Sequence, residues 1–191
     1  GCVTYDSIKI FTTPPIPLNA GNDTLVCPND TITLNASILE NIQYINSLSW
    51  TPSNHLSDAH VLNPLVYPHP STTYQITAFD VFGCLYSDSV LVNRSPALGF
   101  DLGPDALICY GDSIQTPLNI TNAGAGSYQY LWLPSSSVSN VSSQSPYLNP
   151  TDTTNYIVTI IDGNNCSATD QITVNVSPPI NVDAGLSTVV C

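Results

Sequence analysis

Six cysteines are the residues of this chain whose type and spacing point most directly to chemistry. They recur with a constant 82-residue period, and together they are Cys2, Cys27, Cys84, Cys109, Cys166 and Cys191. Regularly spaced thiols indicate disulfide bonds, which persist outside the reducing cytosol. Six cysteines allow fifteen pairings, and the constant period leaves three of them.

The histidines are the other side chains that could bind a metal or act in catalysis. His55, His60 and His69 fall in one loop-rich segment, where a metal site is one interpretation and three solvated side chains are the other. The positions one period further on hold Ser137, Ser142 and Thr151, so no histidine remains there for a Ser–His–Asp triad. Glycine-rich phosphate loops are also absent from the sequence. We therefore expect no enzyme, and no catalytic, cofactor-binding or metal residues.

Calcium is the one cofactor that needs separate consideration. Asp101 with Asp105, and Asp162 with Asn164 and Asn165, offer the oxygen ligands that Ca²⁺ takes. An ion near a domain end would stiffen an array of domains. Because no calcium-loop spacing occurs and turn formation explains these residues equally well, we predict no cofactor and keep Ca²⁺ as the alternative.

The charge of the chain excludes several classes of partner. Fourteen acidic residues stand against two basic ones, Lys9 and Arg94, which gives a formal net charge of −12. A chain without a cationic surface does not bind nucleic acid. No apolar run reaches the roughly 20 residues that a transmembrane helix needs. We expect neither nucleic-acid binding nor a membrane-embedded chain.

The whole sequence repeats with the same 82-residue period as the cysteines. Trp50 corresponds to Trp132, and Tyr74 corresponds to Tyr156. Proline-rich linkers at 13–15, 95–96 and 177–179 set the boundaries. They predict two whole repeats, 17–95 and 99–177, preceded by the last strand of another repeat (1–13) and followed by the first strand of a further one (181–191). On this interpretation the sequence is part of a longer polymer.

Within each repeat the pattern is that of short strands and turns. Residues 31–36 and 73–79 alternate polar with apolar side chains, 80–83 form a hairpin turn, and 61–67 form an edge strand interrupted by proline. About seven strands per 80 residues, with one central Trp, predict an all-β fold of tandem immunoglobulin-like antiparallel β-sandwiches. The predicted core residues are Trp50, Trp132, Tyr74 and Tyr156.

The predicted topology bears on the three cysteine pairings. The first pairing lies within each repeat and consists of Cys27–Cys84 and Cys109–Cys166. The second joins flanking segments and consists of Cys2–Cys27, Cys84–Cys109 and Cys166–Cys191. The third joins successive repeats through Cys27–Cys166. In such a sandwich Cys27 and Cys84 would lie roughly 20 Å or more apart, beyond the ~7 Å limit between bonded Cα atoms. We predict Cys27–Cys166, and the pairing within each repeat stays open.

The first repeat also resembles a known family. It contains 20-AGNDT-24, Cys27, 30-DTITL-34, Ser49-Trp50, 72-TTY-74, Gly83-Cys84 and 88-DSV-90. This pattern is similar to the PKD-like, immunoglobulin-like tandem repeats of Bacteroidota cell-surface adhesins and gliding-associated proteins. The resemblance implies an extracellular location, at the cell surface or secreted. It implies as partners the neighbouring repeats of the same chain, with lateral copies in a filament as a further option.

The resemblance further implies an O-glycosylation signal, in which Asp precedes Ser or Thr and then a small or aliphatic residue or Thr. Six matches give the candidate acceptors Ser7, Thr24, Thr31, Ser89, Ser113 and Thr153. In the other interpretation these Asp-Ser and Asp-Thr pairs simply open strands after turns.

These observations predict a non-enzymatic structural repeat of an extracellular filament, stalk or giant adhesin, which projects a distal binding element from the cell surface. The alternative is a carbohydrate- or surface-binding module attached to a secreted hydrolase. That module would need a row of exposed aromatic side chains, for which the candidates are Tyr44, Tyr67, Tyr128, Tyr130 and Tyr147.

Overall fold

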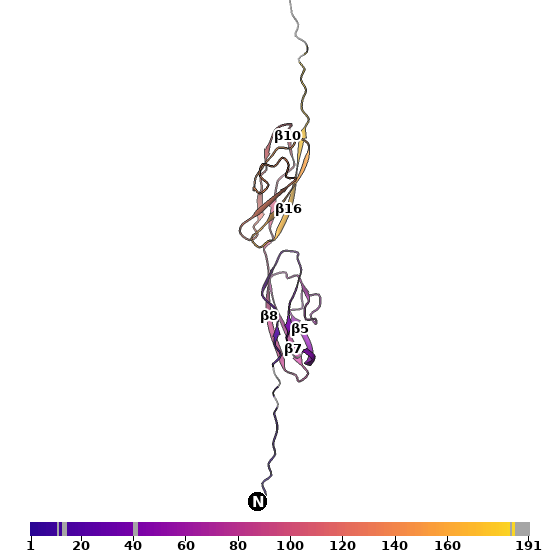
Figure 1. Cartoon of the computed structure of the whole chain (residues 1–191), viewed down its shortest axis with the longest axis vertical. Helices are drawn as coiled ribbons and strands as arrows, with labels where there is room; N and C mark the ends of the chain where they lie inside the picture. The colour runs from indigo at the N-terminus through magenta and orange to yellow at the C-terminus, as the bar shows by residue number, and fades with distance from the viewer. Residues whose placement is uncertain (11, 13–14, 40–41, 184, 186–191) are drawn as a thin grey trace, which may run out of the picture. The chain divides into compact units, whose positions relative to one another are not determined.

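A computed structural model describes residues 1–10, 12, 15–39, 42–183 and 185. The chain divides into two compact units, Gly1–Arg94 (unit 1) and Ser95–Cys191 (unit 2) (Figure 1). Each unit is a β-sandwich that follows from the alternating strands of its own sequence.

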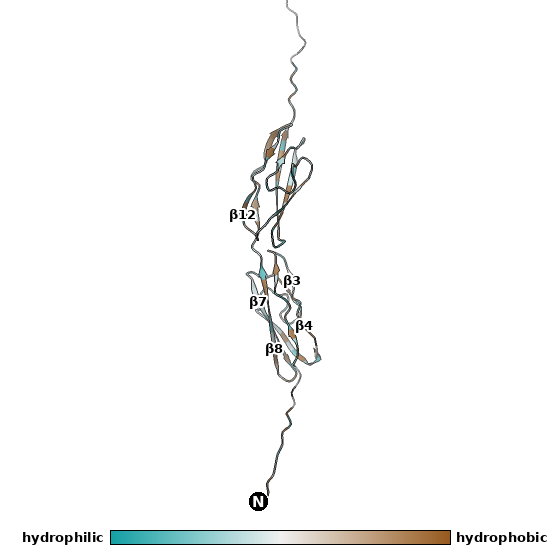
Figure 2. Cartoon of the chain, turned by 60° about the vertical axis from the view of Figure 1, so that its left-hand side comes forward, coloured by the Kyte–Doolittle hydropathy of each residue, from teal (hydrophilic) through white to brown (hydrophobic). Residues whose placement is uncertain are grey.

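The described residues of unit 1 form eight strands and one 3₁₀ turn. These are β1 (Leu18–Asn19), β2 (Thr24–Val26), β3 (Ile32–Thr33), β4 (Ser37–Ile38), η1 (Ile42–Tyr44), β5 (Ile45–Thr51), β6 (Leu65–Val66), β7 (Thr72–Asp80) and β8 (Leu85–Arg94). The larger sheet has the order β2-β8-β7-β5, and the pairs β1-β4 and β3-β6 form the opposite layer. Figure 2 shows β7 and β8 on one side of the unit and β3 and β4 on the other.

Unit 2 repeats this arrangement strand by strand. Its strands are β9 (Gly99–Asp101), β10 (Ala106–Cys109), β11 (Ile114–Gln115), β12 (Asn119–Asn122), β13 (Gln129–Leu133), β14 (Tyr147–Leu148), β15 (Thr154–Ile161) and β16 (Ser167–Ser177). The larger sheet has the order β10-β16-β15-β13, with β9-β12 and β11-β14 opposite.

The registers of the two larger sheets are also equivalent. Trp50 on β5 lies opposite Ile76 on β7, and their repeat counterparts Trp132 on β13 and Val158 on β15 lie opposite each other as well. Since a slip of one residue would turn every side chain to the other face, a shared register places the same repeat positions in both cores. The sequence repeat is therefore a repeat of structure.

The two tryptophans lie at the centres of the two cores. Trp50 is 2% exposed and Trp132 is fully buried. Burial removes the indole N–H from water, and a backbone carbonyl takes the place of water as the hydrogen-bond acceptor. Trp132 Nε1 donates to the Ser143 oxygen at 2.9 Å, and Trp50 Nε1 donates to the Val61 oxygen at 3.1 Å. Tyr74 and Tyr156 are fully buried in the same cores.

Each sandwich contains one parallel pair in addition to its antiparallel ones. In unit 1 the chain leaves its pairing with β4 after Asn19, turns at Gly21 with φ of 96°, and continues as β2 beside β8. Both β2 and β8 run towards the end of the unit where the chain leaves it, so they pair in parallel. A glycine suits this crossing because L side chains avoid positive φ and a Cβ at Gly21 would lie 3.1 Å from the Asn35 carbonyl oxygen.

Some segments differ in extent from the prediction. The strand predicted over 61–67 is reduced to Leu65–Val66, because Pro64 and Pro68 cannot donate to a ladder on either side. Residues 1–10 form no helix or strand, and of 181–191 only 181–183 and 185 are described, also without a strand. In the described part of the chain no helix is long and apolar enough to cross a membrane.

Candidate functional site

The cysteines are in two chemical states. Cys27 and Cys166 are disulfide-bonded, whereas Cys2, Cys84 and Cys109 are exposed free thiols. Cys191 lies outside the described residues. The bonded cysteines belong to different units.

Strand register places the cysteines of each unit far apart. Val26 pairs with Arg94, the last residue of β8, so Cys27 lies beside the end of that strand, while Cys84 directly precedes its first residue. Ten residues at ~3.3 Å per residue separate the two by about 30 Å. In unit 2, Cys109 pairs with Ser177 at the end of β16 and Cys166 precedes its start. We call the end with the β7–β8 or β15–β16 turn the hairpin end, and the other end the linker end.

A buried aspartate organises the hairpin end of unit 1. Asp80 is 3% exposed, and its Oδ1 accepts hydrogen bonds from the backbone N–H groups of Phe82 at 2.9 Å and Cys84 at 2.8 Å. Its Oδ2 accepts from the Tyr86 hydroxyl at 3.1 Å. One carboxylate therefore fixes both the tip of the turn and the cysteine that follows it.

Asp162 has the same role at the hairpin end of unit 2. Its Oδ1 accepts from the N–H groups of Asn164 and Cys166, each at 2.9 Å, and its Oδ2 accepts from Ala125 N–H at 2.9 Å. The position equivalent to Tyr86 is Ala168, so a backbone donor replaces the tyrosine hydroxyl. This replacement needs Gly124, because a Cβ there would clash with the Asp162 carboxylate.

The hydrogen bonds decide the protonation state of these aspartates. Burial alone would raise the pKa of Asp80, but the donors from Cys84, Phe82 and Tyr86 hold the charged form, and the pKa lies below its ordinary value. The pKa of Asp162 is lowered in the same way, since the donors from Ala125, Cys166 and Asn164 outweigh burial. Burial and the Asp80 carboxylate both raise the pKa of the Tyr86 hydroxyl.

The carboxylates considered as calcium ligands are occupied by backbone donors. Besides Asp162, Asp101 accepts from Gly103 N–H and Asp105 accepts from Thr173 N–H, each at 2.9 Å. N–H groups compete with a cation for the same lone pairs. Among the described residues no group of three or more His, Cys, Asp or Glu side chains is placed to hold a metal.

The six candidate glycosylation acceptors lie at the surface, with one exception. Thr24 on β2 is half-buried, while the other five are exposed: Ser7, Thr31, Ser89, Ser113 and Thr153. Two of the preceding aspartates have structural roles. Asp88 Oδ2 accepts from Ala20 N–H and Asp23 Oδ1 accepts from Leu91 N–H, each at 2.8 Å, and both bonds tie the first strands to β8. Asp170 and Asp105 make the equivalent bonds in unit 2, to Leu102 and Thr173.

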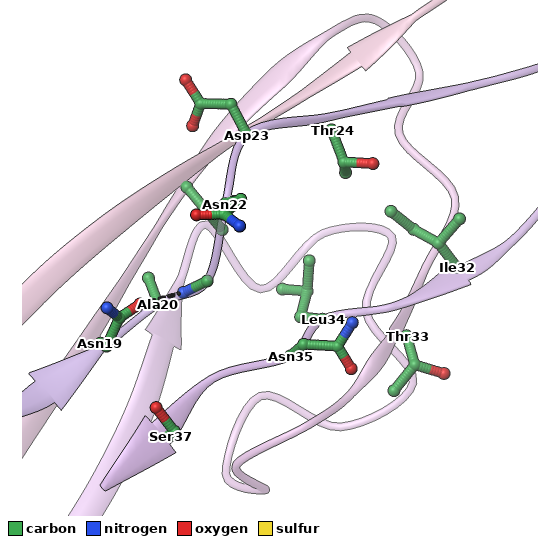
Figure 3. Close-up of a pocket in the computed structure, with 12 residues that line it drawn as sticks. Asn19, Ala20, Asn22, Asp23, Thr24, Ile32, Thr33, Leu34, Asn35 and Ser37 are labelled. Atoms are coloured by element: carbon green, nitrogen blue, oxygen red, sulfur yellow. Dashed lines mark hydrogen bonds between the residues drawn. The ribbon is translucent and has the colours of Figure 1, made fainter. Parts of the chain in front are cut away.

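A polar groove of about 720 Å³ opens in unit 1 between the β1–β2 crossing and the β3–β4 segment. Figure 3 shows Asn19, Asn22 and Asp23 on one wall and Asn35 and Ser37 on the other. The residues that line it include no aromatic side chain, histidine, cysteine or lysine, and its one carboxylate, Asp23, already accepts from Leu91 N–H. The groove therefore provides amides and hydroxyls but neither a nucleophile with a base nor an aromatic surface for a sugar ring.

Sequence reasoning missed the role of the aspartates. Asp80 and Asp162 occupy equivalent positions of the two repeats, each four residues before a cysteine. That spacing is the available signal, but the bonds themselves depend on the turn geometry. The groove gave no signal, since it arises where the chain changes sheets.

Comparison with known proteins gives the fold and no closer relationship. No protein-family model and no curated protein matches the chain. The three N-terminal domains of the bacteriophage RB49 outer capsid protein Hoc match with TM-score 0.51 and 10% identity, over 85% of this chain and 69% of that one. Titin domains I67–I69 match with TM-score 0.42 and 16% identity, over 83% and 64%. Drosophila OTK extracellular domains 3–5 match with TM-score 0.44 and 9% identity, over 81% and 59%, so the chain spans little more than half of that structure.

Topology and comparison together define the class of the protein. At 10% identity the similarity to Hoc concerns the fold alone, and that fold agrees with the strand order of both units. The chain is a tandem of two immunoglobulin-like β-sandwiches.

Proposed function

We propose that the chain is a non-enzymatic structural repeat of an extracellular filament, stalk or giant adhesin, of the PKD-like kind found on Bacteroidota cell surfaces. The observation that carries this proposal is the state of the cysteines: Cys27 and Cys166 are bonded while Cys84 and Cys109 are free. A disulfide that connects consecutive repeats has a mechanical use, whereas one inside a repeat would only stabilise that repeat.

The free thiols of Cys84 and Cys109 favour one of the three periodic pairings. The pairing within each repeat needs Cys84 and Cys109 bonded, and so does the pairing of flanking segments, yet both are free. Only the pairing of Cys27 with Cys166 uses two bonded cysteines and leaves Cys2, Cys84 and Cys109 free.

The proposed disulfide would act together with rigid attachment points. The Asp162 carboxylate fixes the backbone of Cys166, and Asn164 Nδ2 in the same turn donates to the hydroxyl of the linker residue Ser95 at 2.9 Å. Ser95 is 1% exposed. Linker and cysteine are thus both held on the hairpin of unit 2, so tension along the chain would pass through a covalent bond and a buried linker.

Small-angle scattering of the 191-residue chain with and without reductant tests this proposal. We expect an extended pair of beads whose maximum dimension has a narrow distribution, and a broader distribution after reduction, while circular dichroism shows that both units stay folded. Cys27→Ser in the oxidised state should match the reduced protein. Two units collapsed against each other, or a distribution that ignores reduction, would contradict the stalk.

A further inference from the structure

The hairpin end of unit 1 carries an exposed apolar patch. Tyr44 and Phe82 are in contact, with ring centroids 6.2 Å apart, and Val81 N–H donates to the Tyr44 oxygen at 2.8 Å. We define the hairpin patch as the six large apolar side chains here that are 43–63% exposed: Ile42, Tyr44, Phe79, Val81, Phe82 and Leu85. Such a concentration of exposed apolar side chains marks an interaction surface.

The fold does not require this patch, because unit 2 lacks it. The equivalent positions of unit 2 hold Gly124, Gly126, Ile161, Gly163, Asn164 and Ser167. Both hairpins close on a buried aspartate with the same backbone bonds. The aromatic and aliphatic side chains of unit 1 are therefore additions to a turn that forms without them.

The linker end of unit 2 has a pocket of about 290 Å³. This is slightly below the roughly 300–1,000 Å³ of small-molecule sites, and a single aromatic side chain is of suitable size. Its apolar lining is Tyr110, Val176, Pro178 and Pro179, and its polar lining is Thr151, Asp152, Thr153 and Ser177. Unit 1 differs at the equivalent positions, where Pro28 replaces Tyr110 and Arg94 replaces Val176.

Each of these two surfaces has a free thiol beside it. Cys84 follows Phe82 by two residues and is exposed, and Cys109 precedes Tyr110 and is exposed. Cys109 is the repeat counterpart of Cys27, and Cys84 is the counterpart of Cys166. The thiols therefore stand in the same relation to their units as the two bonded cysteines do.

We propose that the hairpin patch of unit 1 binds the linker-end pocket of unit 2 in a second copy of this chain, head to tail, and that Cys84 and Cys109 then form a disulfide. This inference rests on the proposed Cys27–Cys166 bond, whose geometry it repeats between copies. The second copy is the occupant because it supplies both an apolar partner surface and a thiol at the matching repeat position. A head-to-tail contact of this type joins two different surfaces, so it generates a ring where the rotation between copies closes and an open chain where it does not.

The bond forms by exchange with a small-molecule disulfide such as oxidised glutathione. The thiolate of one cysteine attacks the small disulfide and releases one small thiol, and the thiolate of the other cysteine then attacks the mixed disulfide and releases the second. The two cysteines lose two protons and two electrons, and the small disulfide is reduced to two thiols. Docking increases the rate of the second step because it holds the attacking thiol close.

The N-terminal segment offers a matched control for this docking. Cys2 is the repeat counterpart of Cys84 and is also an exposed free thiol, but residues 1–10 form no strand and carry no hairpin patch. Cys2 and Cys84 therefore compete for Cys109 through the same thiol chemistry, but only Cys84 has the hairpin patch beside it. Cys191→Ser removes the sixth cysteine of the chain from the competition.

The experiment oxidises the Cys191→Ser chain with a glutathione redox buffer and follows it on non-reducing gels and by peptide mapping. We expect a ladder of multimers. In its digest, Cys84–Cys109 peptides should exceed Cys2–Cys109 peptides by roughly tenfold, which is the ratio that results when docking raises the equilibrium constant for association by a factor of ten. Equal amounts of the two peptides, or Cys84–Cys109 formed only within monomers, would overturn the proposal. The Cys27–Cys166 peptide in the same digest tests the proposed function separately.

A second variant tests the patch itself. Phe82→Asn installs the residue that unit 2 has at this position, and because Phe82 is 63% exposed the unit should keep its melting temperature. We expect the ladder to form several-fold more slowly. Tyr5→Asn, which removes an exposed aromatic side chain from the N-terminal segment, should leave the rate unchanged. Equal rates for Phe82→Asn and the unaltered chain would overturn the role of the patch.

Discussion

Cys27 and Cys84 lie at opposite ends of strand β8: Cys27 directly follows Val26, which pairs with Arg94, and Cys84 directly precedes Leu85. Ten residues of extended strand separate them by about 30 Å, several times the distance that a disulfide can bridge. The same holds for Cys109 and Cys166 along β16. A bond within either sandwich would require unfolding, so each unit must owe its stability to its own core.

The first prediction concerns the core of unit 2. Trp132→Ala should destabilise the unit by about 3–5 kcal/mol, because it leaves a large cavity and removes the donor to the Ser143 oxygen. The neighbouring Leu131→Ala is the control, since this side chain lies on the outer face and is 46% exposed. Urea denaturation measures both. Similar losses for the two variants would show that β13 does not have the described register.

The second prediction concerns the aspartate of the hairpin. Asp162→Ala should lower Tm by roughly 5–10 °C, because three backbone N–H groups lose their acceptor. Asp112→Ala, at an exposed turn position, should change Tm by less than about 2 °C. Differential scanning calorimetry distinguishes them, and an unchanged Tm for Asp162→Ala would refute the role of the carboxylate.

The third prediction is the pH dependence of stability. The folded pKa values of Asp80 and Asp162 lie below those of the unfolded chain, so the stabilisation is complete above the unfolded value of about 3.9. It decreases as the pH falls through the folded values. Tm should stay level from pH 7 to 5 and fall steeply below pH 4. Asp80→Asn with Asp162→Asn should flatten that fall, and an equally steep fall in the double variant would assign it to other carboxylates.

The fourth prediction separates the structural from the modification role of an Asp-Ser pair. In protein made without glycosylation, Asp88→Asn should lower Tm by a few degrees, since the Ala20 N–H loses a charged acceptor. Ser89→Ala should leave Tm unchanged, because Ser89 is exposed. In a glycosylating host, mass spectrometry should find Ser89 modified in the unaltered chain. An unmodified Ser89 there would leave Asp88 with its structural role alone.

The features that the sequence predicted well are those set by local alternation. Trp50, Tyr74 and their counterparts occupy inward positions of strands whose side chains alternate with period two, so their burial follows from the pattern. The turn at 80–83 was equally visible, because it separates two alternating segments.

Other features depend on contacts between distant segments and were not predictable in the same way. The bond from Ala20 N–H to Asp88 joins distant parts of the unit, and the groove beside Asn35 exists because the chain changes sheets at Gly21. The exposed hairpin patch is different again. Its presence in one unit and absence in the other can be found by comparing the two repeats, but its exposure is a property of the folded turn.

The central claim is that consecutive repeats are joined by a disulfide, and mass spectrometric peptide mapping under non-reducing conditions tests it most directly. Digestion after alkylation of free thiols should yield a peptide that contains Cys27 bonded to Cys166, with Cys84 and Cys109 alkylated. A Cys27–Cys84 or Cys109–Cys166 peptide from the folded protein would contradict both the claim and the strand register on which it depends.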